Sequence, residues 1–244
     1  MKNLILFELK HTPAWNYIII VLIPVTFALL ASSVINTGDF EGRHLIAFDS
    51  LFVVSTFALQ LNRYFPFAMR SNDLGTPFHY VLRPMPLPAS IIAASRFVST
   101  AILLGFFYTV FFLAVYALTP LFRAELPGMA VPAAFLLWLG LGTGISSFYS
   151  AFEAGTKIRK ISFGKNSTAV PLMALVGGFL FIPLLLGINL FYSVTGTGIV
   201  KGITVIAGGA PLAAAGLGLV FFLLGFAFWK WRMNLSLKRV DYHV

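Results

Sequence analysis

Long apolar stretches alternate with short polar ones along most of this 244-residue chain. A helix needs roughly 20 mostly apolar residues to cross a hydrocarbon core about 30 Å thick. The stretches of that length are residues 16–35, 44–62, 97–119, 129–151, 169–194 and 208–231. The pattern therefore predicts an all-α polytopic membrane protein with six transmembrane helices, forming a single domain over residues 1–244.

Positive charge is divided unevenly between the two sides of these predicted spans. All of the 17 Lys and Arg residues except Arg43, Arg123 and Lys201 lie at the termini or between spans two and three or four and five. Because cytoplasmic loops collect Lys and Arg, both termini are expected to be cytoplasmic. The same rule accounts for the net charge of +9, so we expect no nucleic acid as a partner. The first span is longer than the apolar part of a signal peptide and is expected to stay as an anchor.

Composition agrees with a membrane protein and removes several kinds of chemistry. Hydrophobic residues make up 59% of the chain and charged residues 10%, against roughly 25% charged residues in soluble domains. With no cysteine, the chain has no disulfide and no thiolate ligand or nucleophile. The four histidines lie at span edges, in loops or in tails without ligand spacing, and "FGKNST" at 163–168 lacks the first glycine of a phosphate loop. We therefore expect no catalytic residue, metal or cofactor in this chain.

Few polar groups lie inside the predicted spans. Asp49 lies about a turn and a half from the outer end of span two. One interpretation is a carboxylate in the first turn of a helix, favoured by the helix dipole; the other is a polar group on a substrate path. Phe107, Tyr108 and Phe111 make span three strongly aromatic. These rings have two interpretations. They either pack between helices and contact lipid, or they form a lateral path for amphipathic molecules.

Small residues and glycines mark two further segments. Gly140, Gly144 and Ser147 fall on one face of span four, the pattern that lets membrane helices approach closely. Residues 195–209 are apolar but interrupted by glycine. They are too short and too broken to cross, so they either re-enter the membrane from outside as a hairpin or form a surface loop.

Residues 70–96, which lie in the connection between spans two and three, have a composition of their own. They contain four prolines in "RSNDLGTPFHYVLRPMPLPASIIAASRF", which starts at residue 70. Each proline removes an amide donor and restricts the residue before it, whereas a flexible linker uses Gly and Ser. This cytoplasmic loop is thus expected to hold a fixed shape, with a helix restarting at Pro88 and running into span three.

The same loop resembles the loop between spans two and three of type-2 ATP-binding-cassette (ABC) exporter permeases. In that family an acidic residue and an apolar segment precede an "LP-x-[ST/R]-x-x-[IL]-x-x-[AS]-[RK]" run. Asp73 takes the acidic position here. The run from Leu87 to Arg96 is one residue shorter than the pattern and supplies Leu87, Pro88, Ser90, Ile91, Ala94, Ser95 and Arg96 for it, with Ala89 or Ser90 where the family has arginine or threonine. Residues 1–15 resemble the family's interfacial elbow helix, and 195–209 resemble its re-entrant outer hairpin.

The resemblance implies a division of labour. Two permease chains, identical or different, would pair in the lipid of a bacterial plasma membrane, and each would dock a cytoplasmic ATPase subunit that holds ATP and Mg²⁺. The coupling residues would be Asp73, Leu74, Phe78, Tyr80, Leu82, Arg83 and Pro84. The cargo would be an amphipathic or hydrophobic peptide, antibiotic or lipid-like molecule, moved out of the cell.

Two other classes of protein remain open. A secondary transporter or channel would work without an ATPase, although the spans lack buried charges and recognisable duplicated halves. A non-transporting scaffold, such as an immunity protein, would use the 70–96 loop only for binding. Co-purification with a cassette ATPase whose turnover responds to substrate would distinguish all three.

Overall fold

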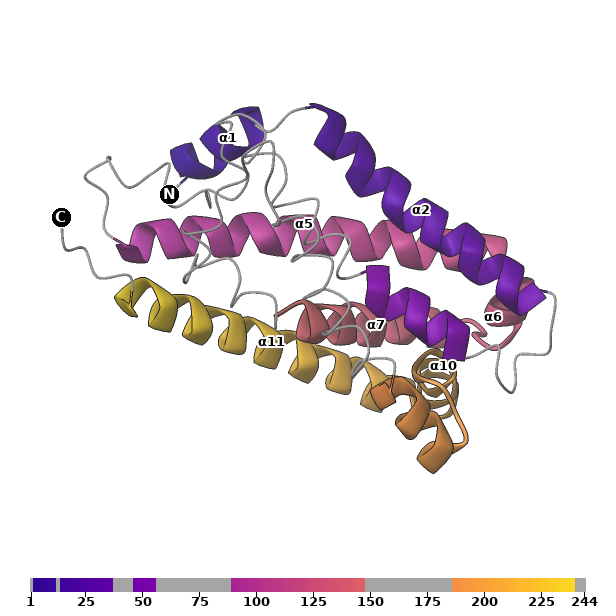
Figure 1. The fold of residues 1–244 in the computed structure, drawn as a ribbon. Helices are drawn as coiled ribbons and strands as arrows, with labels where there is room; N and C mark the ends of the chain where they lie inside the picture. Colours follow the sequence, from indigo (N-terminus) through magenta and orange to yellow (C-terminus); the bar gives the residue numbers. More distant parts are fainter. Residues whose placement is uncertain (1, 12–13, 37–45, 56–88, 148–185, 240–244) are drawn as a thin grey trace.

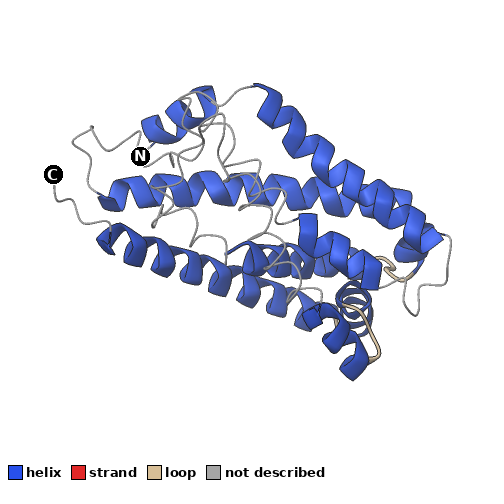
Figure 2. Ribbon diagram, viewed as in Figure 1, coloured by secondary structure: helices blue, strands red, loops and turns tan. Residues whose placement is uncertain are grey.

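The computed structural model describes residues 2–11, 14–36, 46–55, 89–147 and 186–239, and every regular element among them is a helix (Figures 1 and 2). These helices are α1 (Lys2–His11), α2 (Ala14–Asn36), Ile46–Ser55, α5 (Ala89–Leu118), α6 (Pro120–Ala124), α7 (Ala130–Ser147), Leu186–Thr195, α10 (Ile199–Gly209) and α11 (Pro211–Arg239). The prediction of an all-α chain is confirmed for this part of the protein.

Among the described residues, three helices are long and apolar enough to cross a membrane: Ala101–Leu118, Ala130–Ser147 and Pro211–Arg232. The helices Leu186–Thr195 and Ile199–Gly209 meet at a bend of 43° and would make a fourth span if taken together. The described part of the chain thus has several helices fit for a membrane. The count of six spans, the elbow and the cytoplasmic location of the termini stay predictions.

Helices α5, α7 and α11 run roughly along one direction, and α2 lies obliquely to them (Figure 1). The start of α5, the end of α11 and the helix α1 lie at one end, and α6 and α10 lie at the other. α1 packs against α5, α2 also packs against α5, and α7 packs against α5 and α11. The described basic residues of α1 and those of the C-terminal part of α11 are therefore at the same end.

Helix α5 is longer than the predicted third span. It begins at Ala89, directly after the last proline of the 70–96 loop, and runs unbroken to Leu118. At 1.5 Å per residue its 30 residues extend roughly 45 Å, about 15 Å more than a hydrocarbon core. The extra length lies before the apolar window Ala101–Leu118, where serine, threonine and arginine are frequent.

The connection from α5 to α7 is itself structured. Thr119 has an extended backbone and starts α6, with Pro120 in the first turn, where its missing N–H is not needed. Gly128 then takes a left-handed φ of 47°, a conformation that glycine adopts without strain. This tight route directs Phe122 into the protein interior, where it is fully buried.

The glycine-rich segment after residue 195 is a helix from Ile199 to Gly209, although its glycines made it look broken in the sequence. Val200, Ile203, Thr204 and Ala207 form its buried face, and α10 packs against α7 and α11. A methyl group on Gly202 or Gly209 would meet nothing within 4 Å. Tertiary packing of one face thus outweighs the poor helix propensity of glycine. Whether the segment re-enters a membrane stays a prediction.

Candidate functional site

Asp49 lies in the first turns of the helix Ile46–Ser55 and is fully buried. Its carboxylate accepts two backbone hydrogen bonds from the start of α10, from the N–H of Ile199 to Oδ2 at 2.6 Å and from the N–H of Val200 to Oδ1 at 2.9 Å. The residue that begins α10 is Gly198, which has no side chain to cap these donors. Asp49 therefore caps a helix that lies 150 residues further along the chain.

This arrangement explains how a carboxylate can be buried here. Both oxygens receive charge-assisted hydrogen bonds, and the positive end of the α10 dipole faces the negative charge. The helix dipole was one interpretation of Asp49, and the structure adds that its carboxylate meets the N-terminal end of a second helix, α10. The contact also holds Ile46–Ser55 and α10 together.

The aromatic side chains of α5 meet those of the helix that carries Asp49. The ring of Phe52 lies 6.2 Å from those of Tyr108 and Phe111, measured between centroids. Phe107 lies next to both, at 5.4 Å from Tyr108 and 6.3 Å from Phe111. The structure thus places the three predicted path residues next to one another, with Tyr108 and Phe111 beside a ring of Asp49's helix. All three are fully buried, and their role on a substrate path stays a prediction.

Trp138 of α7 lies at the centre of this cluster. Five phenylalanine rings surround its indole with centroids 4.5 to 6.4 Å away. They come from three different segments and are Phe48, Phe52, Phe111, Phe112 and Phe122. Most of these contacts are edge-to-face or tilted, the arrangements that aromatic rings prefer. We call these six side chains the aromatic cluster.

Two polar atoms near the aromatic cluster have no hydrogen-bond partner in the part of the chain that the structure describes. They are Nε1 of Trp138 and Oγ1 of Thr119, the residue that begins α6, and both residues are fully buried. Leaving a buried donor or acceptor unpaired costs about 1–3 kcal/mol, and native proteins contain few such atoms. The five rings around Trp138 are all phenylalanine and offer no oxygen or nitrogen to its N–H.

Tyr108 shows the opposite situation in the same region. Its hydroxyl donates a hydrogen bond to the carbonyl of Gly142 at 2.9 Å and lies 3.0 Å from Oγ of Ser146. Gly142 is necessary for this contact, since a methyl group there would overlap the tyrosine ring. The Tyr108 hydroxyl is therefore fully paired and ties α5 to α7.

The small residues predicted for helix packing lie where α7 meets α11. A methyl group on Gly140 would overlap the carbonyl group of Gly218, and one on Gly225 would come within 3.0 Å of the Cα of Gly144. The two backbones touch because neither helix has a side chain at these points. Ser147 is buried beside them and donates to the carbonyl of Gly144 at 2.6 Å.

The predicted ATPase-coupling residues lie outside the described part of the chain. They are Asp73, Leu74, Phe78, Tyr80, Leu82, Arg83 and Pro84. The described continuation of their loop is α5, which starts at Ala89. Within the described helices no three His, Asp or Glu side chains come together in a way that could hold a metal ion.

Sequence reasoning missed the centre of the cluster. Trp138 is a single aromatic residue in a span whose glycines drew attention, and Phe122 lies in a short connection between spans. Phe48 and Phe52 did carry a signal, since their spacing of four residues places them on one helical face beside Asp49. Comparison with protein-family models, with curated proteins and with solved structures found no match to this chain.

Proposed function

We propose that this chain is the membrane-spanning permease subunit of an ABC exporter that moves amphipathic or hydrophobic molecules out of the cell. A second permease chain and a cytoplasmic ATPase subunit complete the transporter, and ATP and Mg²⁺ bind to the ATPase. Six spans, an interfacial elbow at 1–15 and a re-entrant hairpin at 195–209 belong to this proposal, as does the plasma membrane of a bacterium.

The observation that carries the proposal is the unbroken helix α5 after the proline-rich loop. A displacement of the 70–96 loop acts directly on Ala89, and a continuous helix transmits it to Phe107 and Phe111 without a hinge. Phe111 contacts Phe52 and Trp138. A force applied at the loop therefore reaches the aromatic cluster, roughly 33 Å away at 1.5 Å per residue.

The side chains exposed on the described spans favour an apolar cargo. Exposed side chains on the described spans are mainly leucine, valine, isoleucine and phenylalanine, and the buried carboxylate of Asp49 is already paired. A hydrophilic solute would need polar groups in its path, because burying unpaired polar groups is unfavourable. An amphipathic molecule keeps its apolar part in contact with such surfaces.

Cysteine cross-linking tests the docking of the ATPase, because the chain has no cysteine of its own. Asp73→Cys or Arg83→Cys should cross-link to a co-expressed cassette ATPase. Met129→Cys is the matched control, since this 80% exposed side chain belongs to the connection at the far end of α5. Labelling of position 73 or 83 only by reagents outside the cell would exclude the proposal.

Transport by the reconstituted complex tests coupling. Asp73→Ala or Arg83→Ala should leave the ATPase active but abolish ATP-dependent export of a fluorescent amphipathic peptide. Lys160→Ala removes a charge on the same predicted side outside the loop and should export normally. Export that persists in both loop variants would contradict a coupling role, and a bound partner without turnover would favour the scaffold.

A further inference from the structure

The indole N–H of Trp138 differs from the other polar side-chain group of this region that lies among aromatic rings, the hydroxyl of Tyr108. It is fully buried, its five described ring neighbours are all phenylalanine, and no hydrogen-bond acceptor of the described residues lies within reach. Phenylalanine at this position would fill a ring-lined space without an unpaired donor. By contrast, the neighbouring hydroxyl of Tyr108 has two partners.

We propose that the aromatic cluster is a binding site in which the Trp138 N–H donates a hydrogen bond to a carbonyl oxygen of an apolar ligand. An indole N–H can donate but cannot accept, so it selects acceptors such as the oxygen of a ketone, ester or amide. Phenylalanine rings on several sides would bind the apolar part of the same molecule. The role of this site in transport rests on the proposed exporter function. If the chain is an exporter, the site names the chemical class of its cargo.

The electrostatics of the cluster exclude charged groups as the feature that is recognised. The described carboxylate nearest in sequence to the cluster is Asp49, and both of its oxygens are engaged by α10. An ammonium or carboxylate placed among phenylalanine rings would lose its hydration with no partner in return. A neutral carbonyl loses far less and gains the indole N–H.

Two of the five rings around Trp138 belong to one short helix. Phe48 and Phe52 both belong to Ile46–Ser55, and their rings lie 6.4 and 4.5 Å from the indole. Asp49 lies between them in sequence and fastens this helix to α10. A shift of Ile46–Ser55 together with α10 moves two of the five rings at once, while the other three stay on α5 and α6 beside Trp138.

The experiment observes the indole directly. The full-length chain with Trp15, Trp229 and Trp231 replaced by phenylalanine, labelled with ¹⁵N and held in lipid nanodiscs, gives one indole N–H signal. Addition of 2-tridecanone should shift this proton downfield, whereas tridecane, which lacks only the carbonyl, should not. In calorimetry the ketone should bind about tenfold more tightly than the alkane, as expected for one net hydrogen bond. Trp138→Phe should abolish that preference.

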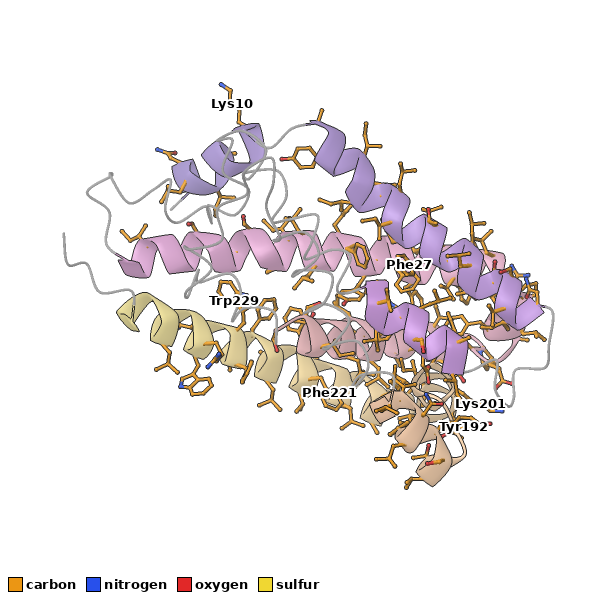
Figure 3. All side chains as sticks on the ribbon, in the orientation of Figure 1. Lys10, Phe27, Tyr192, Lys201, Phe221 and Trp229 are labelled. Carbon is orange, nitrogen blue, oxygen red and sulfur yellow. The ribbon has the colours of Figure 1, made fainter. Side chains whose placement is uncertain are left out.

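A matched control keeps Trp229 as the only tryptophan. This residue is also buried, at 4% exposure, but it lies on α11, which contributes no ring to the aromatic cluster (Figure 3). Its indole signal should be unchanged by either compound. Should the triple variant not fold, the chain with all four tryptophans gives the same test, because the Trp138 signal is the one lost in Trp138→Phe.

Three results would overturn the inference. They are an indole signal that neither compound moves, a signal that both compounds move equally, and a ketone preference that survives Trp138→Phe. The indole signal could already lie, without ligand, at the position typical of a hydrogen-bonded indole. If the ketone then leaves it unchanged, the inference is overturned as well. None of these measurements needs the ATPase, so the site and the exporter function can fail separately.

Discussion

Two regions of this protein solve the problem of packing helices in opposite ways. At the α7–α11 crossing the backbones themselves are in contact, because Gly140 faces Gly218 and Gly144 faces Gly225. In the aromatic cluster α7 meets α5, α6 and the helix Ile46–Ser55 through large rings, with backbones held apart. The same helix, α7, takes part in both.

The difference concerns how much each contact can change. Backbone atoms have no rotamers, so the glycine crossing has one arrangement and any added atom must separate the helices. Rings can turn about their side-chain bonds and exchange neighbours, and two rings of the cluster ride on one short helix. We therefore expect the glycine crossing to act as a fixed frame and the cluster as the part that rearranges.

Gly140→Ala tests the fixed frame and should have the largest effect. The new methyl group would overlap the carbonyl of Gly218, and neither backbone can move without opening the crossing. We expect a loss of about 3 kcal/mol, at the upper end for overpacked sites. Thermal unfolding in mild detergent, followed by circular dichroism, measures it.

Gly216→Ala is the matched control on α11, two residues before Gly218, the neighbour of Gly140. A methyl group there meets nothing within 4 Å, and alanine is the better helix former by up to about 1 kcal/mol. This variant should be as stable as the original chain or slightly more so. Equal destabilisation by both substitutions would mean that α11 itself, and not its crossing with α7, is sensitive.

Asp49→Ala tests the fastening of the helix that carries the two movable rings. It removes two charge-assisted hydrogen bonds and leaves the N–H groups of Ile199 and Val200 without a cap. We expect a loss of about 2–3 kcal/mol, and amide hydrogen exchange at these two residues should become faster by roughly 30- to 100-fold.

Ser50→Ala provides the comparison for this effect. Ser50 is the next residue on the same helix, and its hydroxyl bonds only to the carbonyl of Ile46, at 2.6 Å, within that helix. Its loss should leave exchange at Ile199 and Val200 unchanged. Faster exchange in Ser50→Ala as well would show that the helix as a whole, rather than the carboxylate, holds α10.

The sequence predicted helices well because their signal is local. Apolar stretches of span length and the restart of a helix after Pro88 are visible in the residues themselves, and α5 and α11 lie close to their predicted positions. The spacing of Gly140 and Gly144 by four residues likewise indicates that both lie on one face of a helix. Local patterns of this kind do not depend on what packs against them.

The contacts between distant segments could not be predicted in the same way. The cap of α10 comes from Asp49, so nothing in the glycine-rich residues 195–209 indicates that a helix begins at Ile199. The central position of Trp138 likewise depends on five rings contributed by other segments, which its own sequence neighbourhood does not indicate. Which side chains meet across a bundle depends on how the helices rotate and cross, and periodicity does not fix that.

Tyr108→Phe probes the paired polar group of the cluster region. It removes the hydrogen bond to the carbonyl of Gly142 and the contact with Ser146 but keeps the ring in place. A net loss of about 1 kcal/mol is expected for such a hydrogen bond. Thermal unfolding in detergent measures it, and unchanged stability would mean that the hydroxyl contributes nothing to holding α5 on α7.

Thr119→Val probes an unpaired polar group and should have the smallest effect, with the opposite sign. The Thr119 hydroxyl is buried without a partner and does not cap α6, so valine of the same shape loses no hydrogen bond. Its backbone angles of −116° and 94° suit a β-branched residue. We expect a gain of up to about 1 kcal/mol in the same unfolding assay. A loss as large as that of Tyr108→Phe would show that this hydroxyl is paired in solution, and the two kinds of polar group in this region would then no longer differ.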